Sequence, residues 1–432
     1  MQISGWGRYP LLDSKVHQPL TYSQASTEIT QGFSGIGRGM GRSYGDSSLA
    51  PHVLNNLSLR HILAFNQQTG IITLQSGVTL SELLEIFVPR GWFPPVTPGT
   101  KFVTVAGAIA SDVHGKNHHV EGSFSNHIEQ IKLLLADGSV VTCSASENHE
   151  LFRATCGGMG LTGIILEASI RMKAINSAYI EQTTIKTPNL AAILEAFEVS
   201  KDATYSVAWI DCLGSGKHLG RSILTLGEHA EDGILDLSPR KSHSVPIDMP
   251  GLTINPFTVK AFNTLYYHKV LRQHSTQKIH YEPYFYPLDA LLHWNRLYGK
   301  KGFTQYQFVI PKESGHEGMQ RILKEIAKSG RGSPLAVLKA FGRNNDNFLS
   351  FPQEGYTLAL DFKIDNRLFG FLNELDSIVL DYSGRLYLSK DARMSMQMFR
   401  QGYPMWEDFM QVRKKYGADK TFNSLQSQRL GL

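Results

Sequence analysis

Hydrophobic and polar positions follow two different periods in the first 175 residues of the chain. Gly70 to Gly77 alternate as in a short strand that ends in a turn. From Leu80 to Phe87 the apolar residues instead recur at helical spacing. Thr79 before this run and Glu82 three residues later form the sequence signature of a capping box at a helix N-terminus. The N-terminal part is therefore expected to mix strands and helices.

Strand patterns return along the rest of the chain. Ile128 to Leu135, a turn at residues 136–139 and Val140 to Thr142 together predict a hairpin. In the second half glycine thins out, aromatic residues become frequent, and strand-like runs cover Thr304 to Ile310 and Tyr356 to Phe362. These patterns predict the α+β class.

The change of texture near residue 175 predicts two domains, 1–175 and 176–384, and 432 residues are too many for one comfortable core. Residues 385–432 are expected to form a strand, Arg385 to Leu388, followed by helices. Glu228 to Thr258 is rich in Ser, Pro, His and Asp without a clear period. We expect this stretch to be a long loop.

Composition narrows the function classes. The net charge of +5 is spread along the chain without a long basic block, so nucleic-acid binding is not expected. A mild positive excess suits phosphate-bearing substrates or an anionic membrane surface. The sequence shows neither a secretory signal nor an apolar stretch long enough to span a bilayer. Three cysteines without metal-type spacing favour a reducing compartment, and a cytoplasmic location is expected.

The segment from Gly37 to Asp46 carries the first candidate chemistry. Its closely spaced glycines let the backbone approach a ligand and present successive N–H groups to it, as a pyrophosphate requires, and two arginines stand among them. A set of tight turns is the alternative. The spacing does not match the dinucleotide fingerprint of a Rossmann fold.

Two further segments are rich in small residues, namely Pro98 to Gly115 and Gly157 to Ile165. Both imply close packing against the backbone, and a helix packed tightly on a sheet would explain the former by itself. His114, His118 and His119 follow closely, but no carboxylate or cysteine completes a ligand set, so no metal is expected. Imidazoles beside a phosphate or a flavin edge fit better.

In the second half, side chains that share one strand face are candidates for a substrate site. Gln305 and Gln307 alternate in one predicted strand, and Ala359 and Asp361 do so in another, with Thr357 on the same face. Lys390 follows the predicted strand that begins at Arg385. Near a flavin it would act as a base if burial lowered its pKa. A solvated surface charge is the alternative for this lysine.

Together these segments resemble the vanillyl-alcohol-oxidase-type FAD-binding fold, and within it the flavoprotein (2′-oxidase) subunits of decaprenylphosphoryl-β-D-ribose 2′-epimerase. The similarity runs from Gly5-Trp6-Gly7-Arg8 to the C-terminus. Its most specific parts are residues 39–46, residues 107–110 with 112–119, and residues 157–165. Trp294-Asn295-Arg296, Gln305 to Pro311 and Lys390-Asp391 also match.

The resemblance implies that FAD lies between the N-terminal domain, completed by residues 385–432, and a central substrate domain with an antiparallel sheet. The implied FAD-binding residues are Gly37, Arg38, Gly39, Met40, Gly41, Arg42, Ser43, Tyr44, Gly45, Asp46, Ser47, Gly99, Thr104, Val105, Ala106, Gly107, Ser111, Asp112, Val113, His114, Ile165 and Tyr387. The implied catalytic residues are Lys390, Tyr44 and His114, and substrate binding falls to Gln305, Gln307, Lys339, Asp361 and Trp209.

Two departures from the relatives matter. Arg42 stands where many members of the wider fold carry the histidine that tethers FAD, so noncovalent FAD is expected. Ala359 stands where the epimerase subunits carry a cysteine that nitroaromatic inhibitors trap, so such inhibition should fail here. The thiol is not needed for hydride transfer.

The activity that the resemblance implies is oxidation of a secondary alcohol on a phosphorylated or lipid-linked pentose, a cell-wall polysaccharide precursor, as the first half of an epimerisation. A separate NAD(P)H-dependent short-chain reductase is the expected partner, and a lipid substrate would add peripheral contact with the inner face of the membrane. An aldonolactone oxidase of the same fold, such as a D-arabinono-1,4-lactone oxidase, is one alternative. The other is a flavin-free protein that carries a polyprenyl lipid.

Overall fold

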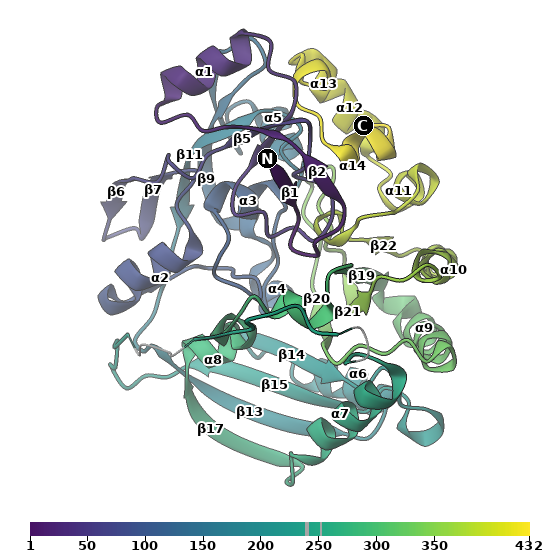
Figure 1. Cartoon of the computed structure of the whole chain (residues 1–432). Coiled ribbons are helices and arrows are strands. Elements are labelled where there is room, and N and C mark those ends of the chain that lie inside the picture. The colour runs from purple at the N-terminus through teal and green to yellow at the C-terminus, as the bar shows by residue number, and fades with distance from the viewer. Residues whose placement is uncertain (238–241, 251–252) are drawn as a thin grey trace.

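The computed structural model describes residues 1–237, 242–250 and 253–432 of the chain. Helices and mainly antiparallel sheets are both abundant, which confirms the predicted α+β class. Figure 1 shows the N-terminal sheets and the C-terminal helices together in the upper part of the molecule and a broad curved sheet in the lower part.

The two larger sheets of the N-terminal part have three and five strands. One is parallel with the order β3-β5-β4, and the other is antiparallel with the order β10-β9-β11-β7-β6. Their strands are β3 (Lys15–His17), β4 (Ile36–Arg38), β5 (His52–Asn55), β6 (Ile62–Asn66), β7 (Ile71–Gln75), β9 (Ile128–Leu134), β10 (Val140–Ser144) and β11 (Ile164–Arg171). The predicted hairpin is confirmed as β9 and β10, in which Val141 lies opposite Leu133.

The predicted capping box starts helix α2 (Leu80–Phe87). The Thr79 hydroxyl accepts a hydrogen bond from the backbone N–H of Glu82 at 3.2 Å, and the Glu82 carboxylate accepts one from the backbone N–H of Thr79 at 2.8 Å. Two N–H groups at the helix start are thereby satisfied, while Leu80, Leu83, Leu84 and Phe87 of α2 are buried in the core.

A single antiparallel sheet dominates the rest of the chain, with the order β17-β13-β15-β14-β20-β21-β19-β22. Its strands are β13 (Tyr179–Thr187), β14 (Tyr205–Ile210), β15 (Ser222–His229), β17 (His274–His280), β19 (Phe303–Pro311), β20 (Ala336–Phe341), β21 (Gly355–Lys363) and β22 (Arg385–Leu386). Helices α6 (Leu190–Val199), α9 (Gly315–Ser329) and α10 (Leu368–Asp381) pack against one of its faces (Figure 1).

Alternation along these strands separates the two faces of the sheet. Phe308, Leu338 and Leu358 are fully buried in the core that the helices share. The intervening residues, among them Gln307 and Thr357, face the other way and line a cavity. The shared faces predicted for the β19 and β21 side chains are therefore confirmed.

The C-terminal segment leaves the sheet after β22 and returns to the N-terminal part. The predicted strand stops at Leu386, and a 3₁₀ turn (Leu388–Lys390) follows it. The helices after that turn are α11 (Met396–Gly402), α12 (Trp406–Lys415), α13 (Ala418–Thr421) and α14 (Leu425–Leu430). The buried Arg413 of α12 donates to the carbonyls of Leu161 at 3.0 Å and Phe422 at 2.6 Å, which ties this segment to the third glycine-rich segment.

The long loop predicted for Glu228 to Thr258 is only partly correct. The loop prediction is wrong at both ends, because strand β15 extends to His229 and helix α7 (Pro256–His268) begins inside the stretch. A two-residue strand, β16 (His243–Ser244), pairs in parallel with β18 (Leu291–Leu292). Residues 238–241 and 251–252 lie outside the described part. Among the described residues, no helix has both the length and the apolar character to cross a bilayer.

Candidate active site

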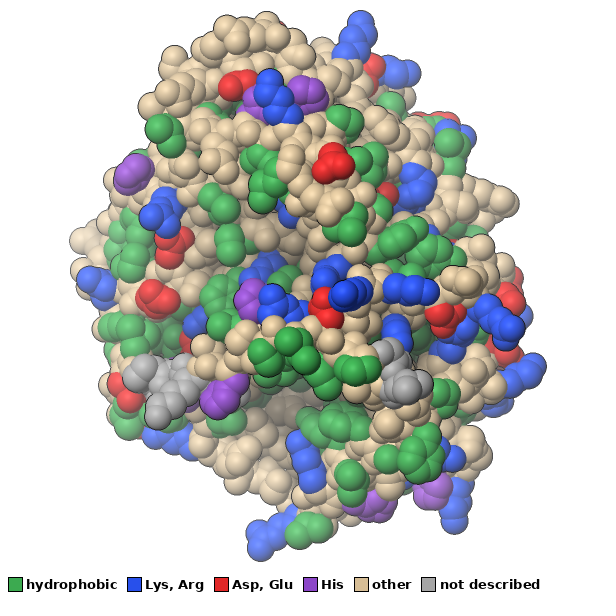
Figure 2. All heavy atoms as spheres, viewed as in Figure 1, with side chains coloured by type: hydrophobic (Ala, Val, Ile, Leu, Met, Phe, Trp, Pro, Cys, Tyr) green, Lys and Arg blue, Asp and Glu red, His purple; other side chains and the backbone are tan. Residues whose placement is uncertain are grey.

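One large cavity lies between the N-terminal part and the central sheet. Its volume is about 790 Å³, within the range of sites for small molecules and cofactors. The three glycine-rich segments line one side, and residues of β14, β19, β20 and β21 line the other. The space-filling view shows a hollow in the lower half of the molecule, partly rimmed by hydrophobic side chains (Figure 2).

The first glycine-rich segment is held in place by Arg38. The Arg38 guanidinium donates to the carbonyls of Ser4 at 2.7 Å and Ser48 at 3.1 Å. Gly41 lies beside this guanidinium with a φ of +62°, and a Cβ there would stand 2.3 Å from Nη2. Both the left-handed backbone and the close approach therefore require glycine. Residues 39–44 of the loop beyond Arg38 line the cavity.

The second and third segments complete the same wall. The Thr104 hydroxyl caps helix α3 (Val105–Ala110) by accepting from the backbone N–H of Gly107 at 3.1 Å. A Cβ on Gly39 would stand 2.3 Å from that hydroxyl, so the first segment packs directly on the second. The backbone N–H of Met159 donates to the carbonyl of Ala110 at 2.8 Å and joins the third segment to α3.

The wall has the features that an FAD molecule would use. Gly99 borders the cavity, and a Cβ built on it would meet no atom within 4 Å, so open space lies directly beside the backbone. Asn56 also lines the cavity, and its buried Oδ1 has no hydrogen-bond partner within the described residues. Unpartnered buried polar atoms are rare in native proteins and indicate a missing ligand or water. The residues therefore fit the cofactor.

Lys390 lies at the end of the 3₁₀ turn, where it borders the cavity. Its Nζ stands 3.9 Å from the ring centroid of Tyr44, a cation–π distance. Burial lowers the pKa of Lys390 to about 7; Asp361 opposes this shift and Lys339 adds to it. The lysine is thus partly neutral near neutral pH, as a general base requires.

Asp361 and Gln305 form a polar pair on the sheet side of the cavity. The Gln305 side-chain amide donates to the Asp361 carboxylate at 2.6 Å. Burial raises the pKa of Asp361 to about 7, although Gln305 and Lys390 lower it in part. Lys339 on β20 also lines the cavity, and burial lowers its pKa to about 8. Lys390, Asp361 and Lys339 are therefore all groups that titrate close to neutrality.

His114 ends a chain of hydrogen bonds from the sheet. The Thr357 hydroxyl donates to the carbonyl of Phe308 at 2.8 Å, so its oxygen accepts from the Gln307 amide at 3.2 Å. The same amide donates to His114 Nε2 at 3.0 Å. Burial holds the pKa of His114 well below its usual range, so the ring is neutral. Because Nε2 accepts the hydrogen bond from Gln307, the ring proton is on Nδ1. That Nδ1 is buried without a partner among the described residues, so it is a free donor for a ligand.

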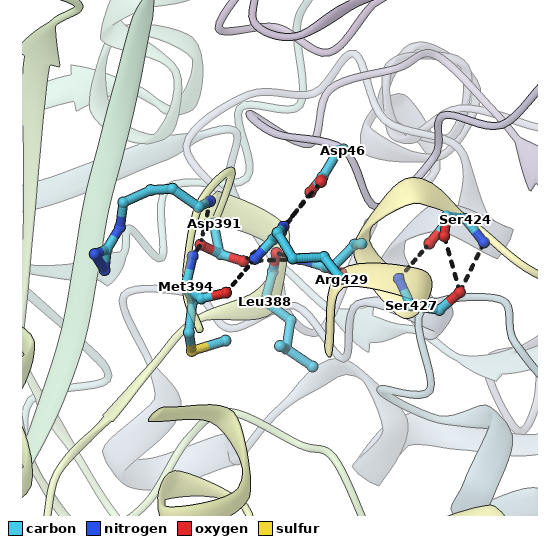
Figure 3. Close-up of polar contacts among 9 residues, drawn as sticks. Asp46, Leu388, Asp391, Met394, Ser424, Ser427 and Arg429 are labelled. Atoms are coloured by element: carbon cyan, nitrogen blue, oxygen red, sulfur yellow. Dashed lines mark hydrogen bonds and ion pairs between the residues drawn. The ribbon is translucent and has the colours of Figure 1, made fainter. Parts of the chain in front are cut away.

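An ion-pair cluster fixes the turn that carries Lys390 to the first glycine-rich segment (Figure 3). Arg429 of α14 lies 2.8 Å from a carboxylate oxygen of Asp46 and 2.8 Å from one of Asp391. The other Asp391 oxygen accepts from the backbone N–H groups of Arg393 at 2.8 Å and Met394 at 2.6 Å. Burial alone would raise the pKa of Asp391, but Arg429 and Arg393 together lower it.

The structure brings most of the predicted site residues to this cavity. Those expected to contact FAD that line it are Gly37, Arg38, Gly39, Met40, Gly41, Arg42, Ser43, Tyr44, Ser47, Gly99, Thr104, Ala106, Gly107, Ser111, Val113, His114, Ile165 and Tyr387. The residues expected to act on substrate, Gln305, Gln307, Lys339, Asp361, Trp209 and Lys390, line it as well, and so does Ala359.

Four residues expected to contact FAD do not line the cavity. Gly45 packs on the backbone of Asp391, where a Cβ would come within 1.8 Å of the carbonyl oxygen. Asp46 is paired with Arg429, and Val105 is buried in the core. Asp112 accepts hydrogen bonds from the backbone N–H of Ser125 at 3.0 Å and from three side chains of residues 345–350. Each therefore supports the wall from behind.

Some residues that line the cavity were not predicted. They are Asn56, Thr97, Lys116, Tyr284, Asp289 and Ser389, among others. Lys116 donates to the carbonyl of Tyr284, and burial lowers its pKa to about 7. It stands inside the histidine-rich run 114–119, so its position was a usable signal. The sequence around Tyr284 and Asp289 carried none.

Gly99 offers a direct test of the cofactor wall. Replacing it with leucine should leave the fold intact, since the side chain has room, but should fill the space beside the backbone and lower the FAD content severalfold. Gly370→Leu on the exposed surface of α10, where a Cβ also meets no atom within 4 Å, is the matched control. FAD released by acid precipitation and divided by protein concentration measures both variants.

Full FAD content in Gly99→Leu would contradict this placement of the cofactor. Flavin that stays in the acid pellet of the unaltered protein would contradict noncovalent binding.

Comparison with known proteins agrees with this geometry. Residues 30–144 match the FAD binding domain family. Decaprenylphosphoryl-beta-D-ribose oxidase of Mycolicibacterium smegmatis is 37% identical over 100% of this chain and 97% of its own length. L-gulono-1,4-lactone dehydrogenase of Mycobacterium tuberculosis is 20% identical over 89% of this chain and 87% of its own. A putative D-arabinono-1,4-lactone oxidase of Neurospora crassa is 29% identical, but over only 31% of this chain and 24% of its own.

Full-length similarity at this level, together with a cavity wall built as an FAD site, shows the family. The chain is an FAD-dependent oxidoreductase and belongs to the decaprenylphosphoryl-β-D-ribose oxidase family.

Proposed function

We propose that this protein oxidises a secondary hydroxyl of a polyprenyl-phosphate-linked pentose to a ketone. The single observation that carries the proposal is that one cavity joins the glycine-rich wall, a group of polar and cationic side chains around Lys390, and an apolar end. The apolar end is lined by Val207, Trp209, Ile223, Phe262, Leu335 and Val337. A pentose, a phosphate and a lipid tail would each find matching chemistry there.

The proposed domains follow from the same arrangement. Residues 1–175, completed by 385–432, would bind FAD, and residues 176–384 would bind the substrate. Bound FAD would supply the hydride acceptor, its N5 atom. Arg42 Cζ lies 4.1 Å from the ring centroid of Trp6. A guanidinium offers no nucleophile for a covalent bond to FAD, which supports noncovalent binding.

Lys390 would take the hydroxyl proton. Its depressed pKa provides the neutral amine, and the Tyr44 ring beneath it favours the ammonium that forms. Gln305, held by Asp361, would orient the sugar hydroxyls. The free Nδ1–H of His114 would donate to an oxygen of the bound molecules. Placement of the reacting carbon by these groups is the protein's contribution to the rate.

The phosphate would bind between Lys116 and Lys339. Both side chains line the cavity, and the charge of Lys339 lowers the pKa of Lys116, so a phosphate bound there would favour the charged form of both lysines. A free aldonolactone would leave both the cations and the apolar end without partners. We therefore favour the lipid-linked sugar over a lactone. A separate NAD(P)H-dependent reductase would then reduce the ketone.

Replacing Lys390 tests its role as the base. Lys390→Met and Lys390→Arg should both keep FAD but slow flavin reduction by a polyprenyl-phosphate pentose about 10²–10⁴-fold, the usual contribution of a general base. Arginine keeps the positive charge but cannot lose its proton. Stopped-flow absorbance of the flavin under anaerobic conditions measures the rate. Near-normal reduction in Lys390→Arg would show that the charge alone matters.

The pH dependence of flavin reduction should report the pKa of Lys390. The neutral amine becomes populated as pH rises through about 7, so the rate should rise and then level off. Asp361→Asn removes a carboxylate that raises this pKa, so the midpoint should move to lower pH. Lys339→Met removes a cation that lowers it, so the midpoint should move to higher pH. Shifts in the same direction, or none, would refute the assignment.

A further inference from the structure

Helix α7 presents an apolar face to solvent at the apolar end of the cavity. Phe257 is 81% exposed and Leu265 is 73% exposed, and Ala261 lies between them at the same four-residue spacing. Leu271, just after the helix, is 90% exposed. Large apolar side chains grouped in this way are unusual on a protein surface unless the surface binds something.

The opposite side of α7 is fixed to the molecule. Val259 and Asn263 are buried, and the Asn263 amide donates to the Asp211 carboxylate at 2.8 Å. An Asn255 capping box starts the helix. The exposed face therefore belongs to an anchored, thirteen-residue helix and not to a frayed end.

The same helix borders the cavity. Phe262 and Tyr266 line it, and the Tyr266 ring packs 4.8 Å from that of Trp209 on β14. Helix α7 thus carries the exposed apolar face and also borders the apolar end of the cavity. A lipid that left a membrane under α7 would reach the cavity along apolar side chains.

Positive charge is in excess in the sequence around this face, although one of its cations, Lys278, pairs with Asp232. Residues 249–281 contain four Lys or Arg residues, which are Lys260, Lys269, Arg272 and Lys278, and no Asp or Glu. Lys269 stacks over Tyr266, with Nζ 3.5 Å from the ring centroid. Exposed apolar side chains flanked by cations are the pattern of a helix that lies in the interface of an anionic membrane.

We infer that α7 and Leu271 dock this protein on the surface of an anionic bilayer, with Phe257, Leu265 and Leu271 inserted among the lipids and the cavity mouth turned toward them. The inference rests on the proposed function for its purpose, since a lipid-linked substrate resides in the membrane. The docking itself does not require catalysis and is tested without substrate.

Pelleting of the FAD-loaded protein with lipid vesicles tests the inference. The unaltered protein should bind vesicles of equal parts phosphatidylglycerol and phosphatidylcholine, and bind pure phosphatidylcholine more weakly. A variant with Phe257→Gln, Leu265→Gln and Leu271→Gln should bind at least about tenfold more weakly because it loses three buried apolar side chains. The matched control carries Leu11→Gln, Leu20→Gln and Leu63→Gln, three exposed leucines on the N-terminal part, and should bind normally.

A fluorescent reporter makes the contact specific. Tryptophan placed by Phe257→Trp should shift to shorter emission wavelengths on the anionic vesicles and be quenched by brominated lipid, whereas Leu20→Trp should not respond. No binding by the unaltered protein, or equal loss in both triple variants, would overturn the inference. So would a lipid-free dimer that the α7 variant dissociates, because the face would then join two copies of the chain.

Failure of docking and failure of the proposed function are distinguishable. Flavin reduction by a water-soluble, short-chain analogue in lipid-free solution reports only on the active site. The α7 triple variant should retain that activity even where it no longer binds vesicles.

Discussion

The site depends on one guanidinium shared by two carboxylates that are far apart in the sequence. Arg429 pairs with Asp46 in the first glycine-rich segment and with Asp391 beside Lys390 (Figure 3). Because the cluster is largely buried, loss of one partner would leave an unpaired charge, at a cost of about 3–5 kcal/mol. The C-terminal helix thus holds the candidate base against the wall that is built for the cofactor.

Next to this ion-pair cluster, the alternation of side chains along the strands of the central sheet determines which residues line the cavity. One face of β19, β20 and β21 is buried under helices, so the other face alone supplies Gln305, Gln307, Lys339, Thr357 and Asp361 to the site. Burial in a space closed on several sides lowers the pKa of Lys390 to about 7 and raises that of Asp361 to about 7. Both the protonated and the deprotonated forms of Lys390 and Asp361 are therefore populated near neutral pH. The described residues contain no cluster of side chains that could hold a metal ion.

The features that depend on residues close together in the sequence were predicted correctly. The capping box at Thr79, the hairpin of β9 and β10, and the shared faces of β19 and β21 depend on neighbours in sequence or on strand period, and all were correct. The family resemblance assigned Asp46 and Asp112 to the cofactor, but their partners are Arg429 and a loop near residue 347. Only the folded chain reveals such distant partners. Helix α7 was also missed, because its apolar residues lie on more than one side, with Phe257 and Leu265 exposed and Val259 buried, so no single apolar stripe marks it in the sequence.

The central claim is that this flavoenzyme oxidises a lipid-linked pentose. Its most direct test is anaerobic bleaching of the flavin absorbance by a panel of polyprenyl-phosphate pentoses and free aldonolactones. We expect rapid bleaching by at least one polyprenyl-phosphate pentose and little by any lactone. Bleaching by lactones, with none by the lipid-linked sugars, would contradict it.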